Sequence, residues 1–153
     1  MAKRYNPLVA PDPKEWLEMD ENRRVQMVLD YHLEAGIRIP NPYLHAVIHA
    51  AVENQAALGD ETPVEQTLRR LMDEGLDRHD AIHAVGSVLL NHIWNFLQGG
   101  GPADDSDPNV AYFEEVRQLT AQKWIAEYTD EEAEPRWRFP ARRRRHPRPR
   151  GTA

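Results

Sequence analysis

The stretch that decides the fold runs from residue 41 to residue 59 and reads NPYLHAVIHAAVENQAALG. It begins with Asn41-Pro42, where the Asn side chain can cap the first helical turn and proline fits the first helical position. It ends at Gly59, a residue type favoured just beyond the last turn of a helix. Since no residue between these two signals breaks a helix, the stretch predicts a helix over 42–58.

Similar start and stop signals lie on both sides of this stretch, and no segment shows the polar–apolar alternation of a strand. We therefore expect an all-α protein, a single helical bundle of about five helices. The expected helices cover about 21–35, 42–58, 64–74, 78–97 and 108–128, with a short extra helix over 12–19. The bundle is expected over 12–128, between an extended arm at 1–11 and an acidic-to-basic tail at 129–153.

The composition excludes several functional classes. The chain has 153 residues, which suits one domain, and it has no cysteine, which excludes disulfides, thiolate metal sites and cysteine nucleophiles. No stretch approaches the roughly 18 consecutive apolar residues of a membrane span, so we expect no membrane partner. Residues 1–20 lack the apolar segment of a signal peptide.

The formal net charge of −6 combines two opposite parts. The stretch 136–150 holds eight arginines and no acid, while residues 1–135 carry a net charge of −14. We expect a disordered, Arg- and Pro-rich C-terminal tail that can bind nucleic acid or another polyanion. The arginines expected to contact a polyanion are Arg138, Arg142, Arg143, Arg144 and Arg145. A solubilising terminus, or one that folds back onto the acidic bundle, is the alternative.

Four of the seven histidines form two HxxxH pairs, His45/His49 and His79/His83. Residues four apart project from the same face of a helix, and both pairs fall at the edge of the apolar face of their helix. Side chains in that position meet at a helix–helix interface, where two such pairs can hold one metal ion. Glu53 extends the first pair by one more turn.

We therefore predict a metal-binding bundle whose ligands are His45, His49, Glu53, His79 and His83. His32 is a possible additional ligand, and the alternative is a hydrogen-bonded core histidine. Imidazoles alone favour zinc, whereas a carboxylate favours iron or manganese, so a divalent transition metal, zinc or iron, is the expected cofactor. Haem ligation by a facing histidine pair is a further alternative. The sequence identifies no catalytic residue, reaction or substrate.

Two partial resemblances concern the same residues. The HxxxE motif at 49–53 followed by HxxxH at 79–83 partly resembles hemerythrin-like bundles, which pair such helices around a di-iron centre, although a further helix separates the motifs here. The dipeptide His79-Asp80 also resembles that of HD-type metal phosphohydrolases. We interpret Asp80 instead as a carboxylate in the first turn of a helix capped by Asp77.

A wider resemblance rests on three segments. They are Asn41-Pro42-x-Leu44-His45, Glu53-Asn54-Gln55 and Leu71-x3-Gly75-x3-His79-x-Ala81-x-His83. Over about residues 10–98 they resemble an uncharacterised bacterial domain-of-unknown-function family of small all-helical proteins with paired HxxxH motifs. The resemblance implies a bacterial, cytoplasmic protein and no established activity. The main alternative function is a non-enzymatic adaptor that binds a polyanion through its tail.

Overall fold

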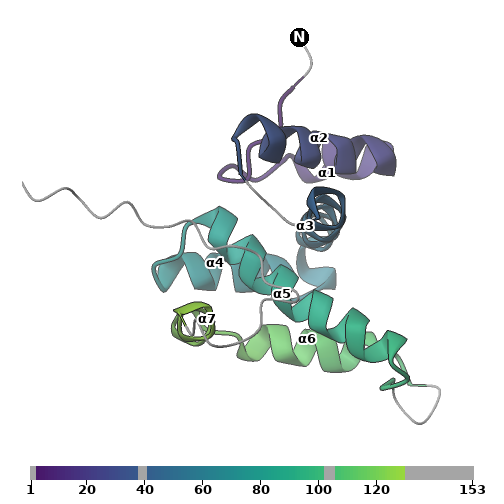
Figure 1. Cartoon of the computed structure of the whole chain (residues 1–153), viewed down its shortest axis with the longest axis vertical. Coiled ribbons are helices and arrows are strands. Elements are labelled where there is room, and N and C mark those ends of the chain that lie inside the picture. Colours follow the sequence, from purple (N-terminus) through teal and green to yellow (C-terminus); the bar gives the residue numbers. More distant parts are fainter. Residues whose placement is uncertain (1–2, 38–40, 102–105, 130–153) are drawn as a thin grey trace, which may run out of the picture.

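The computed structural model describes residues 3–37, 41–101 and 106–129 (Figure 1). Within these ranges the chain forms seven α-helices and one 3-10 turn, and no strand. The helices are α1 (Pro13–Glu18), α2 (Glu21–Glu34), α3 (Pro42–Ala57), α4 (Val64–Asp73), α5 (Arg78–Leu97), α6 (Asn109–Gln118) and α7 (Ala121–Thr129), and the 3-10 turn is η1 (Gly59–Glu61). The all-α prediction is confirmed.

The expected number of about five helices is wrong: the short extra helix forms as α1, and the last expected helix is divided into α6 and α7. At Leu119 the backbone is extended, with φ −62° and ψ 134°, which ends α6. The next residue, Thr120, then starts α7, since its side-chain hydroxyl accepts the backbone N–H of Lys123 at 3.1 Å. A threonine cap inside a run of helix-forming residues gives a weak signal, and the sequence interpretation missed it.

The starts of α3 and α5 fix the positions of the paired histidines. The side chain of Asn41 accepts the backbone N–H of Leu44 at 3.0 Å, and that of Asp77 accepts the N–H of Asp80 at 2.8 Å. Both predicted caps are therefore present. They satisfy backbone donors that a helix start leaves unpaired, and they set the first turn of each helix.

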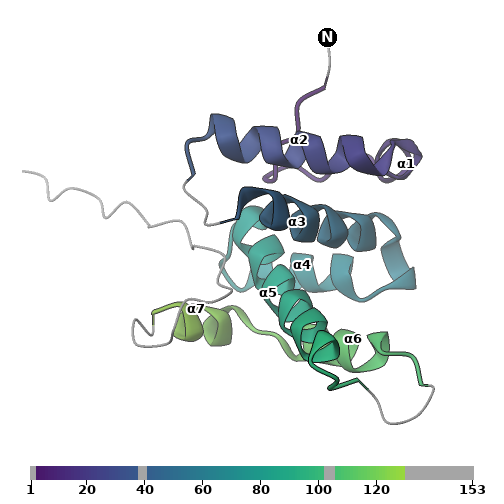
Figure 2. The same cartoon turned by 45° about the vertical axis from the view of Figure 1, so that its right-hand side comes forward.

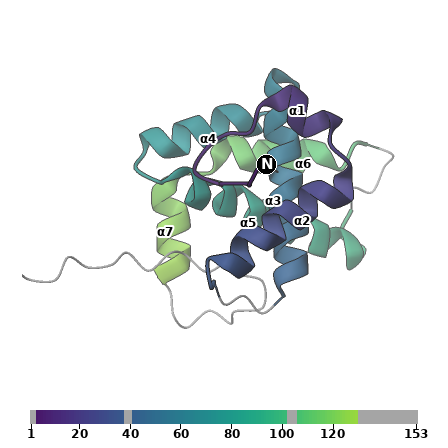
Figure 3. The same ribbon diagram turned by 90° about the horizontal axis from the view of Figure 1, so that it is seen from above.

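The helices lie at three levels along the long axis of the molecule (Figures 1 and 2). Helices α1 and α2 lie at one end, α3, α4 and α5 in the middle, and α6 and α7 at the other end. Seen from above, α2 crosses over α3 (Figure 3). None of the helices in the described ranges is long and apolar enough to cross a membrane.

Most of the buried apolar side chains form one cluster between the middle level and α6 and α7, which we call the apolar core. Its members are Val52, Ala56, Val64, Leu68, Leu71, Leu76, Ala81, Ile82, Ala84, Val85, Val88, Tyr112, Val116, Leu119, Ala121 and Trp124. A smaller cluster lies where α2 packs on α3. It contains Tyr5, Trp16, Val28, Ala46 and Ala50. The candidate functional site lies on this second side of the molecule.

The predicted tail lies outside the described residues. This applies to its disorder and to the proposed polyanion contacts of Arg138 and Arg142–Arg145. Both therefore stay predictions.

Candidate metal centre

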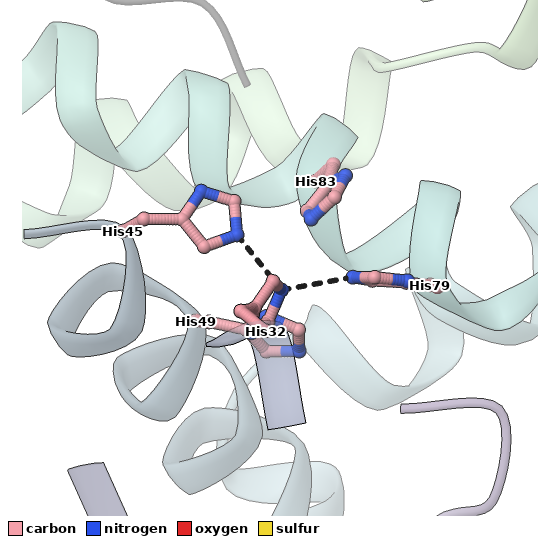
Figure 4. Close-up of side chains that lie close together, drawn as sticks. All are labelled: His32, His45, His49, His79 and His83. Atoms are coloured by element: carbon pink, nitrogen blue, oxygen red, sulfur yellow. Dashed lines mark hydrogen bonds between the residues drawn. The ribbon is translucent and has the colours of Figure 1, made fainter. Parts of the chain in front are cut away.

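Five histidines from three helices meet in the interior (Figure 4). Helix α2 supplies His32, α3 supplies His45 and His49, and α5 supplies His79 and His83. One ring nitrogen of each lies within 4.8 Å of those of the others, and no side chain is more than 6% exposed. Both predicted HxxxH pairs therefore meet, and His32 joins them.

Small residues on α3 allow α2 to bring His32 into the group. Ala46 and Ala50 are buried on the face of α3 that packs against Val28 of α2. Because Val28 precedes His32 by one helical turn, both side chains point toward α3. The close packing of α2 on α3 places the imidazole of His32 beside those of His45 and His49, with ring centroids 4.5 and 5.1 Å away.

The ring of His32 is oriented by its own helix. Its Nδ1 lies 2.8 Å from the carbonyl oxygen of Val28, and since a carbonyl can only accept, Nδ1 carries the proton. The other nitrogen, Nε2, lies 3.0 Å from Nε2 of His45 and 3.2 Å from Nε2 of His79. A neutral imidazole has one lone pair, so Nε2 of His32 can accept only one of these contacts as a hydrogen bond.

Burial favours the neutral form of these imidazoles. It lowers the pKa of His32, and together with the neighbouring histidines it lowers the pKa of His45 to about 3. Burial and four neighbouring histidines hold the pKa of His49 well below its usual value. All three side chains are therefore neutral at physiological pH, which is the form that binds metals.

Glu53, a predicted ligand, lies outside the five-histidine group, and this corrects the expectation from its helical spacing. The side chain of Glu53 is 1% exposed. It accepts two hydrogen bonds from the guanidinium of Arg78, with Nη1–Oε1 and Nη2–Oε2 distances of 2.8 Å. A buried bidentate pair of this kind compensates both charges. The carboxylate therefore binds protein donors.

The N-terminal segment supplies a residue that the sequence interpretation missed. Tyr5 is only 7% exposed, its hydroxyl donates to Oε1 of Glu53 at 2.5 Å, and it lies 2.7 Å from Nε2 of His49. Arg78 also donates to the carbonyl oxygen of Pro7 at 3.0 Å. The arm expected to be extended thus packs against the site. No periodic pattern marks Tyr5, so only the folded chain reveals it.

The other described histidine lies elsewhere. His92 pairs with Glu115 of α6 and contacts the ring of Tyr112. Around α5 the side chain of His92 projects away from those of His79 and His83, which agrees with its place outside the five-histidine group.

Together, the fold and the site define a small all-helical protein with a buried cluster of five histidines. The chain belongs to the family described as Domain of unknown function (DUF1841), whose model matches residues 7–129. The resemblance to a domain-of-unknown-function family is confirmed, over a longer span than the expected 10–98, while paired HxxxH motifs as a feature of that family stay a prediction. No curated protein and no solved structure matches the chain. Bacterial origin and cytoplasmic location stay predictions.

Proposed function

We propose that this protein binds one divalent transition-metal ion through its buried histidines. The proposed ligands are His32, His45, His49, His79 and His83, so His32 takes the place first expected for Glu53. The observation that carries the proposal is the convergence of five buried ring nitrogens, three of which belong to imidazoles kept neutral by burial. One metal cation can bind the lone pairs of several imidazoles at the same time, whereas one proton is bonded to a single ring nitrogen.

The distances favour one ion rather than two. Metal–nitrogen bonds of about 2.1 Å place two ligands at right angles about 3.0 Å apart, and opposite ligands about 4.2 Å apart. The distances from Nε2 of His32 to Nε2 of His45 and His79, 3.0 and 3.2 Å, match adjacent ligands. The upper limit of 4.8 Å over the whole group lies close to the span of one coordination sphere.

The donor set also narrows the choice of metal. Imidazole suits zinc, copper, nickel and iron. Among the described residues, the group of five histidines offers neither thiolate nor carboxylate. Four imidazoles already complete the tetrahedron of a structural zinc site. A fifth histidine therefore supports a metal that accepts five or six ligands, such as iron, with zinc as the alternative.

Elemental analysis of the full chain, purified without a histidine tag, tests this proposal. We expect close to one metal ion per chain, and its loss in the double variant His49→Ala/His83→Ala. The control is His92→Gln, which removes a histidine outside the group and should leave the metal content unchanged. Substoichiometric metal that does not change in the folded double variant would refute the proposal.

A further inference from the structure

A continuous chain of hydrogen bonds leads from Arg78 to the histidine group. Arg78 donates twice to Glu53 at 2.8 Å, Tyr5 donates to the same carboxylate at 2.5 Å, and the hydroxyl oxygen of Tyr5 lies 2.7 Å from Nε2 of His49. All four side chains are buried, with exposures between 1% and 7%. The chain therefore lies in a region where an unpaired polar atom is costly.

The direction of each bond in this chain determines the tautomer of His49. Glu53 accepts throughout, so the single hydroxyl proton of Tyr5 lies toward Glu53. The oxygen of Tyr5 must then accept from His49, which places a proton on Nε2. Since a neutral imidazole carries one N–H, Nδ1 of His49 keeps its lone pair.

Among the described residues, no hydrogen-bond donor contacts the lone pair on Nδ1 of His49. Nδ1 of His49 is fully buried and has no hydrogen-bond partner among the described residues. Leaving a buried acceptor unsatisfied costs about 1–3 kcal/mol. One ring nitrogen of His49 lies within 4.8 Å of a ring nitrogen of each of the other four histidines. Because Nε2 of His49 carries its proton toward Tyr5, Nδ1 is the nitrogen with a lone pair for a cation held there.

We propose that Tyr5 is a positioning residue that holds His49 in the Nε2–H form, so that His49 binds the metal ion through Nδ1. Glu53 and Arg78 fix the hydroxyl of Tyr5 in turn. His32 is arranged the opposite way, because its Nδ1–H donates to Val28 and leaves Nε2 for the ion. This assignment rests on the proposed function, and it adds an N-terminal residue to a site built from three helices.

The first test reads the tautomer directly in the unmutated chain. After loading with one equivalent of Zn²⁺, a diamagnetic probe, long-range ¹H–¹⁵N correlation spectra distinguish a protonated ring nitrogen from a metal-bound one. We expect His49 to show a protonated Nε2 and a zinc-bound Nδ1, and His32 to show the reverse. A zinc-bound Nε2 on His49 would overturn the assignment and leave the metal site itself intact.

The second test removes only the hydroxyl, with Tyr5→Phe. Loss of a group that orients a metal-binding histidine lowers metal affinity by about 10- to 100-fold, so zinc affinity measured by chelator competition should fall by that factor. The matched control is Tyr31→Phe. The ring of Tyr31 contacts His32 and His79 edge-on, with centroids 5.3 and 5.8 Å away, and it should keep the wild-type affinity.

The outcomes separate this assignment from the proposed function. Equal zinc affinity in a folded Tyr5→Phe variant and in the wild type would overturn the role of Tyr5 alone. A wild-type chain that takes up no zinc or other metal would overturn the metal site and this assignment together. If Tyr5→Phe does not fold, the tautomer measured in the wild-type chain still decides the question.

Discussion

The apolar core and the histidine group are both buried, but they bury opposite kinds of side chain. In the apolar core, large residues such as Leu68 and Leu71 are almost completely covered, and each contributes about 1.5–3 kcal/mol by leaving water. The histidine group instead places polar rings in the interior, and a buried polar atom costs free energy unless it has a partner. One part of the molecule is thus stabilised by its own side chains, and the other is the part that the proposed metal ion would stabilise.

Helix α5 belongs to both regions. Its first turns direct His79 and His83 toward α2 and α3, while Ile82 and Val85 lie in the apolar core. Two neighbouring faces of one helix thus serve different purposes. The comparison predicts that perturbations of one region leave the other largely unchanged.

Metal removal should produce the largest difference between the two regions. A ligand present at a thousandfold excess over its Kd stabilises the native state by about 4 kcal/mol, so stripping the metal should lower stability by at least that order. Hydrogen exchange should then accelerate in α2, which holds His32, and remain slow in α4, which packs in the apolar core. Equal acceleration in both helices would show that the regions are one cooperative unit.

Leu68→Ala probes the apolar core alone. Leu68 is 1% exposed, and truncating a buried leucine costs about 2–5 kcal/mol, partly because a cavity remains. Urea unfolding should show this loss while the metal content per folded chain stays that of the wild type. The control Leu58→Ala, at a side chain that is 40% exposed, should change stability far less. Loss of metal from folded Leu68→Ala would contradict the independence of the regions.

Acid should destabilise the metal-free chain through the histidine group. The folded-state pKa is about 3 for His45 and well below the usual value for His49. As the pH falls, these two histidines are therefore protonated in the unfolded chain before they are protonated in the folded chain. The free energy of unfolding should therefore decrease between pH 7 and pH 6, by about 1.4 kcal/mol for the two together. Urea unfolding of chelator-treated protein measures this slope.

The variant His45→Gln/His49→Gln provides the control for the acid effect. Glutamine keeps a polar side chain at each position but does not titrate in this range. The slope of stability against pH should be flatter in this variant. An unchanged slope would assign the acid sensitivity to other groups.

Local signals were sufficient to predict most of the helices and the shared face of each histidine pair. The caps Asn41 and Asp77 act within three residues of their own position, and the HxxxH spacing is a property of one helix. The break between α6 and α7 at Leu119 and Thr120 was not predicted. A single threonine cap is a weak signal within a run of helix-forming residues, and only the folded chain shows that the helix ends there.

The roles of Glu53 and Tyr5 could not be predicted, because they depend on contacts between segments that are far apart in the sequence. Helical spacing placed Glu53 beside His49 but gave no sign of Arg78, 25 residues later, which binds its carboxylate. Similarly, Tyr5 lies 44 residues before His49 and belongs to no helix. The sequence showed which side chains share a face, whereas the partner of each depends on how the helices pack.

Tyr112→Phe should have the smallest effect and gives the finest test of the comparison. The ring of Tyr112 lies in the apolar core, while its hydroxyl donates to Oε1 of Gln55 on α3 at 2.6 Å. Removing one such hydrogen bond costs about 1 kcal/mol. The control Tyr43→Phe, at a side chain that is 62% exposed, should be neutral. Metal affinity should stay at the wild-type value, because Gln55 faces the apolar core while His45 and His49 face α2 and α5. Reduced metal affinity in Tyr112→Phe would show that α3 transmits strain between the two regions.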